Sequence, residues 1–429
     1  MTSERTNTTV FATLPGAVTA VPAGTLSLFE AGAVVEASRF RYGTRYTQRA
    51  NAIEVDPVSL PLAGPAERQP AHGLAEFGAI RDAAPDLWGR LVIERKLGQT
   101  GPLPESVYLE HAGGNGVGAL EFRARPDSAP RGGGVAHAAD LAYLVEAAAC
   151  IEAGEPVPAG LEAIFDAGSS VGGARPKAVV LDDDRQWLAK FESRGDRWNV
   201  PAIEYATLQM ARECGLNVPE VRLLRLAGDK TVMLIERFDR RAAAAGFERV
   251  HFVSALTMLG MHRTEMSRAT YADLARVIEQ RGAAGAVAVD RIELFRRMVF
   301  NILVSNDDDH LRNHGYLFDA GARGWRLSPL YDVVPKPQIV HERYLLLGVG
   351  PRGPAAILDN AVDGSGQFGL TARASAEIVD RMARVVRQWR VAFAASGITE
   401  REMEPVATAF RRYADMGGGA VEKLLRQPA

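Results

Sequence analysis

The most constraining feature of this chain is a short polar stretch between two apolar runs. It covers residues 306–318, NDDDHLRNHGYLF, and follows the run Val299–Val304. Three carboxylates and two Asn side chains are therefore enclosed by segments that a fold buries. An apolar run that enters a packed loop and then a short strand holds polar groups rigidly in one place. The pattern predicts a functional loop over residues 306–313.

The spacing within this loop narrows the chemistry. Asp308 and Asn313 are five residues apart, as are the base and the metal-binding Asn of the protein-kinase catalytic loop. A further acid, Asp332, follows in an apolar context, where a kinase carries its second metal-binding Asp. One Asp-x4-Asn pair recurs by chance, and the third residue makes the pattern more specific. It predicts Asp308 as a proton acceptor and Asn313 and Asp332 as oxygen ligands of Mg²⁺.

The other polar residues of the loop are assigned less direct roles. Only the spacing to Asn313 selects Asp308 among three adjacent acids. We expect Asp307 and Asp309 to cap or bond the loop backbone. His310 has no His or Cys partners at zinc-ligand spacing, which argues against a zinc site.

Length and composition predict a soluble globular protein with two or three domains. The 429 residues exceed one core, and the contents of 47% hydrophobic and 24% charged residues are ordinary. A net charge of −2 gives no basic footprint for autonomous nucleic-acid binding. Cys150 and Cys214 are expected to be buried, reduced thiols. No signal-peptide core follows the polar residues 1–9, and no apolar window could span a membrane, so a cytoplasmic location is expected.

The first 155 residues contain sheet and helix signals. Residues 1–20 are expected to be a loose leader, and turn-separated alternation over residues 25–42 predicts an antiparallel sheet whose core holds Phe40 and Tyr42. Asp86 is expected to cap a helix over Leu87–Leu97. The glycine-rich residues 113–122 lead into a strand rather than a helix, so they predict a turn and not a dinucleotide-binding loop.

The next region carries a candidate phosphate-binding loop and a lysine. Residues 168–177 are rich in Gly and small side chains, which can bring backbone N–H groups against phosphate, although a plain turn is the simpler interpretation. Two strands follow, and Lys190 lies on the second. It is either an edge-strand lysine that reaches water or a lysine that binds nucleotide phosphates. Glu204, on a helix over Ile203–Cys214, could orient Lys190 or lie on an exposed first turn.

The remainder is mainly helical. An apolar strand that runs into a charged exit over residues 231–238 stands where the two-lobed kinase layout has its adenine-binding hinge. Helices are expected at 255–260, 271–280 and 289–301, and two long amphipathic helices at 372–395 and 399–425.

Together these motifs resemble the HipA-type toxin kinases. The resemblance covers most of the chain, including the N-terminal sheet. It rests on the loop 170–177, the strand ending at Lys190, Glu204-Tyr205 before 215–219, the stretch 236–241, the loop 308–313 and Tyr331-Asp332.

This resemblance implies an α+β, bilobed protein-kinase-like fold, with antiparallel sheets in the N-terminal lobe and a mainly helical C-terminal lobe. The expected divisions are an N-terminal subdomain (1–155), a nucleotide-binding part (156–250) and a helical catalytic lobe (251–429). The implied activity is that of a Ser/Thr-protein kinase toxin of a toxin–antitoxin pair, which transfers the γ-phosphate of ATP to a protein such as an aminoacyl-tRNA synthetase. The implied partner is a HipB-like helix-turn-helix antitoxin, with DNA contacted only through that complex.

The resemblance also implies roles for individual residues. Asp308 is the implied catalytic base, Asn313 and Asp332 hold Mg²⁺, and Lys190 contacts the phosphates of ATP. Ser170 is the implied site of an inactivating autophosphorylation, with Ser169 as the alternative. The remaining implied nucleotide-binding residues are Gly172, Gly173, Ala174, Arg175, Pro176 and Lys177 at the phosphates, Glu236, Arg237 and Phe238 at the adenine, and His310, Leu311, Arg312 and Tyr331 around the nucleotide.

Two alternatives stay open at this point. The same site could phosphorylate a lipid or a small metabolite. The chain could also be a non-catalytic scaffold that keeps the kinase shape and binds the antitoxin, although every expected polar group is present.

Overall fold

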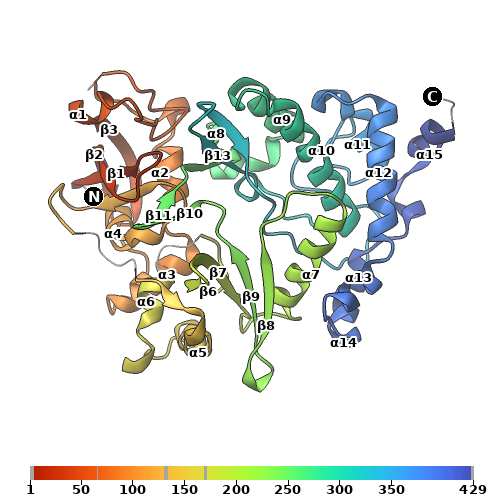
Figure 1. The fold of residues 1–429 in the computed structure, drawn as a ribbon, viewed down its shortest axis with the longest axis horizontal. Helices are drawn as coiled ribbons and strands as arrows, with labels where there is room; N and C mark the ends of the chain where they lie inside the picture. The colour runs from red at the N-terminus through yellow and green to blue at the C-terminus, as the bar shows by residue number, and fades with distance from the viewer. Residues whose placement is uncertain (1–3, 65, 130–133, 169–171, 427–429) are drawn as a thin grey trace. The chain divides into compact units, whose positions relative to one another are not determined.

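The computed structural model describes residues 4–64, 66–129, 134–168 and 172–426. The fold is a mixed α+β type, with an antiparallel sheet near the N-terminus and a more helical C-terminal part (Figure 1). The chain forms two compact units. The first comprises Met1–Gly195 and Leu224–Val253, and the second comprises Asp196–Leu223 and Ser254–Ala429.

The first unit begins with a four-stranded antiparallel sheet in the order β3-β2-β1-β4. The strands are β1 (Glu4–Thr13), β2 (Ala20–Ala31), β3 (Val34–Tyr42) and β4 (Leu120–Arg123). The prediction of a loose leader was wrong, because β1 is an inner strand. Its Thr residues favour extended backbone, and its Val10, Phe11 and Ala12 are buried.

The predicted aromatic core of this sheet is confirmed. Phe40 and Tyr42 are buried and meet edge to face, with ring centroids 4.9 Å apart. Phe77, which lies outside the sheet, packs against Phe40 with ring centroids 6.1 Å apart. The Tyr42 hydroxyl donates to the Leu60 carbonyl at 2.7 Å, so burial of this polar group is compensated.

The first unit also contains six helices within its described residues. The predicted glycine-rich turn is confirmed, since a 3₁₀ turn at Gly113–Asn115 precedes β4. Cys150, on α5, is a free thiol that is only half-buried, whereas full burial was expected. The helices are α1 (Thr44–Thr47), α2 (Gly78–Ala83), α3 (Leu87–Lys96), α4 (Glu105–His111), α5 (Leu141–Ala153) and α6 (Ala163–Ala167).

A five-stranded sheet in the order β5-β6-β7-β9-β8 carries the candidate phosphate-binding segments. Its inner pairs β6–β7 and β7–β9 are antiparallel. An acidic turn joins β6 and β7: Asp183 and Asp184 have φ of 48° and 57°, the backbone that a two-residue type I′ hairpin requires. The strands are β5 (Ala136–His137), β6 (Lys177–Asp182), β7 (Arg185–Phe191), β9 (Thr231–Glu236) and β8 (Val221–Arg225), and the division between the units falls within β8. A hairpin of β10 (Arg240–Ala243) and β11 (Gly246–Arg249) and the short β12 (Phe252–Ser254) follow.

The second unit is built on α10 (Val287–Val304), most of whose side chains are buried. The hairpin of β13 (Gly315–Asp319) and β14 (Gly324–Leu327) follows it. Helix α15 (Gly419–Arg426) lies beside α12 (Ala372–Val386) (Figure 1). The other helices of this unit are α7 (Val200–Glu213), α8 (Ala255–Met258), α9 (Tyr271–Arg281), α11 (Leu358–Asp363), α13 (Trp389–Ala395) and α14 (Glu400–Met403).

The prediction of one long helix over 399–425 was wrong. Helix α14 ends at Met403, a 3₁₀ segment begins at Glu404, and α15 does not begin until Gly419. Pro405 lacks the N–H that a continuing helix needs, and Gly417 has a φ of 65° that interrupts helical backbone. Among the described residues, none of the helices is both long and apolar enough to cross a bilayer.

Candidate active site

The polar loop predicted from the sequence follows α10 directly. Helix α10 ends at Val304, and the φ of 53° at its C-cap residue Ser305 turns the chain out of the helix. Asn306 is bound back to the helix, because its backbone N–H donates to the Asn301 carbonyl at 3.0 Å and its amide donates to Asn301 Oδ1 at 3.1 Å. A 3₁₀ turn, Leu311–Asn313, then leads into β13. The expected order of apolar run, packed loop and strand is confirmed.

Asp308 and Asn313 are joined within this loop. Asn313 Nδ2 donates to the Asp308 carbonyl at 2.8 Å, so the five-residue spacing closes into a compact turn. The amide oxygen of Asn313 is the atom left for a metal ligand. The Asp308 side chain is 58% exposed, so its carboxylate is accessible to a substrate hydroxyl.

The residue before Asp332 is bonded to the same turn. The Tyr331 hydroxyl donates to the Arg312 carbonyl at 2.8 Å. Asp332 has a φ of 57°, in the left-handed region that a residue with a side chain adopts at a cost of roughly 1 kcal/mol or more. Its exposed carboxylate and the Asn313 amide oxygen are the hard oxygen donors that suit Mg²⁺. Across the residues that the structure describes, no three His, Cys, Asp or Glu side chains cluster with metal-binding geometry.

Asp309 is buried beneath the loop. Its Oδ2 accepts a hydrogen bond from the Tyr271 hydroxyl at 2.8 Å, and its Oδ1 accepts one from the Leu346 N–H at 2.7 Å. Asn301 donates to the same Tyr271 oxygen at 2.9 Å. Burial raises the pKa of Asp309 to about 6, against the lowering effect of these hydrogen bonds. Asp309 therefore accepts a hydrogen bond from the backbone, as expected, but its partner is Leu346 in a later segment of the chain.

Asp307 makes a different set of contacts from the one predicted. Its Oδ1 lies 3.0 Å from Lys336 Nζ, and its Oδ2 accepts a hydrogen bond from Gln338 Nε2 at 2.5 Å. The same Nζ lies 3.4 Å from Asp308 Oδ2. These partners are side chains from the segment after Asp332. Lys336 was not singled out from the sequence, and the only signal was a lysine between prolines four residues after that acid.

The remaining loop residues are more buried. Leu311 is buried, whereas His310 and Arg312 are half-buried. His314, which follows the turn, is buried edge-on against Tyr271, with ring centroids 5.4 Å apart. Burial and the nearby Arg297 lower the pKa of His314 to about 3, so this imidazole is neutral and belongs to the support of the loop.

In the first unit, the candidate phosphate-binding loop at residues 172–177 is hydrogen-bonded to the start of α3. The Gly173 N–H donates to Asp86 Oδ2 at 3.0 Å, and the Trp88 N–H donates to the Gly173 carbonyl at 3.1 Å. Trp88 Nε1 also donates to the Lys177 carbonyl at 2.8 Å. Asp86 stands at the predicted N-cap of α3 but makes no capping bond there; its carboxylate holds the loop instead. Ser169 and Ser170 lie outside the described residues.

Gly173 and Lys177 show why this loop needs glycine. Gly173 has a φ of 97°, a backbone conformation that strains any residue with a side chain, and an added Cβ would also displace the flexible Lys177 Nζ. That ammonium donates to the Gly172 carbonyl at 2.6 Å. Gly172, Ala174 and Arg175 are exposed, whereas Pro176 and Lys177 are buried.

Lys190 lies on an inner strand. On β7 it pairs with Lys177 of β6 on one side and with Met233 of β9 on the other. The edge-strand alternative was therefore wrong. Glu204, on α7 of the second unit, is 2% exposed, which excludes the alternative of a solvated first turn.

The expected adenine-binding stretch holds one strongly anchored residue. The Arg237 N–H donates to the Gln186 carbonyl at 2.9 Å, and its guanidinium donates to the Asn115 carbonyl at 2.7 Å and to Asp239. Burial alone would raise the pKa of Asp239, but Arg237 and Arg240 hold it well below its usual range. The Arg237 side chain thus fixes the loop at 115–118. Glu236 and Phe238 are half-buried.

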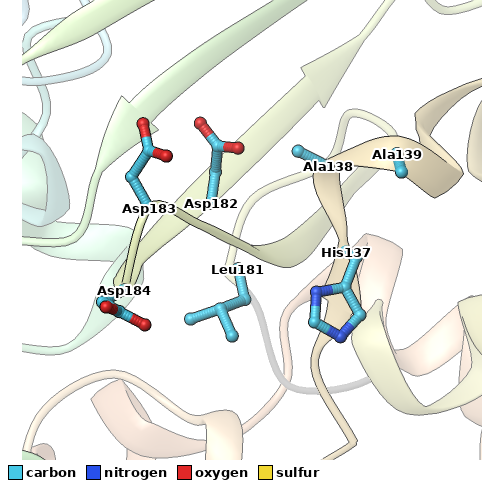
Figure 2. Close-up of a pocket in the computed structure, with 7 residues that line it drawn as sticks. All are labelled: His137, Ala138, Ala139, Leu181, Asp182, Asp183 and Asp184. Atoms are coloured by element: carbon cyan, nitrogen blue, oxygen red, sulfur yellow. The ribbon is translucent and has the colours of Figure 1, made fainter.

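A hollow of about 340 Å³ lies elsewhere in the first unit (Figure 2). It contains none of the predicted site residues. The carboxylates of Asp182 and Asp183 point to the same side in Figure 2. Its lining residues are His137, Ala138, Ala139, Leu181, Asp182, Asp183 and Asp184.

Comparison with solved structures defines the class of fold. The HipA chain in a complex of HipA, HipB and operator DNA from Shewanella oneidensis matches with a TM-score of 0.66. The match covers 98% of this chain and 100% of that one at 18% identity. The fold is therefore HipA-like. The HipA-like C-terminal domain family matches residues 169–389, more than half of the chain. This chain belongs to that family.

Three relatives are described as proposed kinases. One from Haemophilus influenzae is 26% identical over 203 residues, which is 42% of this chain. Y4dM and Y4mE of Sinorhizobium fredii are 29% and 24% identical, over 34% and 69% of this chain. The chain spans 57% of the length of the first protein, 37% of Y4dM and 71% of Y4mE.

Proposed function

We propose that this protein is an ATP-dependent Ser/Thr-protein kinase. The observation that carries the proposal is the loop of the second unit, in which Asn313 Nδ2 bonds the Asp308 carbonyl and Tyr331, the residue before Asp332, bonds the Arg312 carbonyl. An exposed carboxylate, an amide oxygen and a second carboxylate are the groups that phosphoryl transfer uses for proton acceptance and metal binding. Membership of a family with relatives described as kinases supports the same activity.

Asp308 is the catalytic base in this proposal. Phosphoryl transfer depends on positioning and charge neutralisation more than on covalent chemistry. The Asp308 carboxylate orients the substrate hydroxyl and takes its proton as the new P–O bond forms. The hydrogen bond from Asn313 fixes the backbone of Asp308, which limits the conformations open to that carboxylate.

Asn313 and Asp332 are the proposed Mg²⁺ ligands. The donor set fits, because one amide oxygen and one carboxylate leave room for phosphate oxygens and waters in an octahedral shell. Bound Mg²⁺ would neutralise charge on the phosphates. The left-handed backbone of Asp332 is the kind of strain that is retained at functional positions.

The first unit is proposed to supply residues for the nucleotide. Lys190 is assigned to the phosphates together with residues 172–177, and Glu236–Phe238 to the adenine. The placement of Lys190 on an inner strand, between β6 and β9, agrees with this assignment. The lobes of a protein kinase and the divisions at 155 and 250 belong to this proposal, as does autophosphorylation at Ser170.

The proposed biological setting is a toxin–antitoxin pair. The solved HipA chain forms a complex with HipB and operator DNA, so we infer a HipB-like antitoxin as the partner here, with DNA contacted through that complex. The net charge of −2 agrees with indirect DNA contact. The target is proposed to be a protein hydroxyl, such as one on an aminoacyl-tRNA synthetase.

The decisive experiment is incubation of the purified protein with γ-labelled ATP, Mg²⁺ and cell extract. Wild type should label a protein band, and Asp308→Gln should abolish labelling while ATP still binds. Because Asp308 is exposed, the variant should fold normally. Labelling of lipid or metabolite alone would point to a small-molecule kinase, and ATP binding without turnover would point to a scaffold. Undiminished labelling by Asp308→Gln would refute its role as the base.

A further inference from the structure

Lys336 lies between the first two acids of the catalytic loop. Its Nζ is 3.0 Å from Asp307 Oδ1 and 3.4 Å from Asp308 Oδ2. The side chain is 42% exposed, so the ammonium is accessible from solvent while it contacts both carboxylates. A cation is thus present beside the carboxylate that is proposed to accept the substrate proton.

Hydrogen bonds hold both the backbone of Lys336 and the Asp307 carboxylate that contacts its ammonium. Its backbone N–H donates to the Ser305 carbonyl at 3.1 Å, at the residue that ends α10. Asp307 is held in turn by Gln338 Nε2 at 2.5 Å, and the Gln338 carbonyl accepts from Arg343 Nη2 at 2.9 Å. Asp307 therefore acts as a fixed anchor for the ammonium, while the exposed Asp308 contact is longer and easier to exchange.

Stability alone is a weak explanation of this contact. Ion pairs with this exposure contribute on the order of 0–1 kcal/mol. The geometry suits a transferring phosphate better. A hydroxyl bonded to Asp308 lies about 2.6–3.2 Å from its carboxylate, and the attacked phosphorus lies about 3–3.5 Å beyond. The flexible stem of a lysine can cover that distance while Asp307 still holds the ammonium.

We propose that Lys336 binds the transferring γ-phosphoryl group, with Asp307 as its positioning residue; this inference rests on the proposed kinase activity. The substrate oxygen forms the new bond to phosphorus as the bond to the β–γ bridging oxygen breaks, and ADP leaves. The hydroxyl proton goes to Asp308. Lys336 keeps its protons and donates an N–H to a non-bridging oxygen, where negative charge is concentrated during transfer.

The test compares nucleotides that differ at the γ-position. Calorimetry with Mg²⁺ measures the affinities of AMP-PNP and of ADP for wild type, Lys336→Met and Lys336→Arg. Lys423→Met, which changes an exposed lysine on α15, is the matched control. Lys336→Met should weaken AMP-PNP binding about tenfold or more, as expected for loss of a charged hydrogen bond, and should change ADP affinity less than about twofold. Lys336→Arg should restore part of the difference, and Lys423→Met should match wild type.

Turnover gives the second measurement. Lys336→Met should lower kcat on the order of 10²-fold with an unchanged melting temperature. Equal losses of affinity for both nucleotides, or no loss for either, would overturn the inference. Faster phosphoryl transfer by Lys336→Met would also overturn it, because it would show that Lys336 blocks Asp308. If wild type is active and Lys336→Met has the same nucleotide affinities and kcat, the inference about Lys336 is refuted but the kinase proposal is not. A wild type that binds neither nucleotide removes both.

Discussion

Asp309 should make the second unit less stable as the pH rises through the weakly acidic range. Its pKa is raised from 3.8 to about 6 because its carboxyl is buried. The folded state therefore binds more protons than the unfolded chain between about pH 4 and pH 6, and stability falls as pH increases across that window. At 1.36 kcal/mol per pKa unit, the full loss is about 3 kcal/mol.

The substitution Asp309→Asn removes this titration. Its amide oxygen can accept from the Leu346 N–H, but its amide nitrogen then faces the Tyr271 hydroxyl, which loses its acceptor. That loss costs on the order of 1 kcal/mol and does not depend on pH. The diagnostic quantity is therefore the pH dependence of the difference between variant and wild type, and not its absolute value.

The assay is thermal unfolding from pH 4 to pH 7.5. For a unit of about 200 residues, 3 kcal/mol corresponds to roughly 6–12 °C in Tm. Wild type should lose most of that amount relative to Asp309→Asn as pH rises from 4 to 7. Asp308→Asn, an exposed change in the same loop, should keep the wild-type pH dependence. Parallel curves for wild type and Asp309→Asn would refute the reasoning.

Two further predictions concern the first unit. Asp239→Asn should lower the free energy of unfolding by about 3–5 kcal/mol, because it removes the carboxylate that lies 2.7 Å from the buried guanidinium of Arg240. Urea denaturation measures this free energy, and a change below about 1 kcal/mol would contradict the prediction. Trp88→Phe should cost about 1–2 kcal/mol through loss of its bond to the Lys177 carbonyl. If residues 172–177 bind phosphate, the same variant should raise the KM for ATP more than it lowers kcat, and an unchanged KM would argue against that role.

The sequence predicted what depends on local patterns. Hydrophobic periodicity located α10 and the inner strands, and the order of apolar run, polar loop and short strand was predicted around residues 306–313. The sequence-based predictions failed where contacts between distant parts of the chain determine the structure. The Thr-rich residues of β1 look like a polar leader until their neighbours β2 and β4 are known.

The contacts of the acids show the same limit. Asp86 has the residue type and position of a helix cap, yet its carboxylate binds Gly173, 87 residues later. Asp307 and Asp309 are distinguished only by partners about 30 to 40 residues away, in Lys336 and Tyr271. No spacing rule relates such partners, because folding and not chain distance brings them together. The role of each predicted site residue, and the three-part division of the chain, stay predictions.

The bonds of Arg343 have a consequence for engineering this protein. Its guanidinium donates to Ser305 Oγ at 2.5 Å and to the carbonyls of Thr408 and Ala409 at 2.6 and 3.1 Å. Ser305 Oγ also donates to the Ala409 carbonyl at 2.6 Å. A shortened version that stopped at the family match, which ends at residue 389, would remove the backbone carbonyls of Thr408 and Ala409, which bind the side chains of Arg343 and Ser305 at the start of the loop 306–313. Trimming the chain to its recognisable domain would therefore yield a protein whose inactivity says nothing about its chemistry.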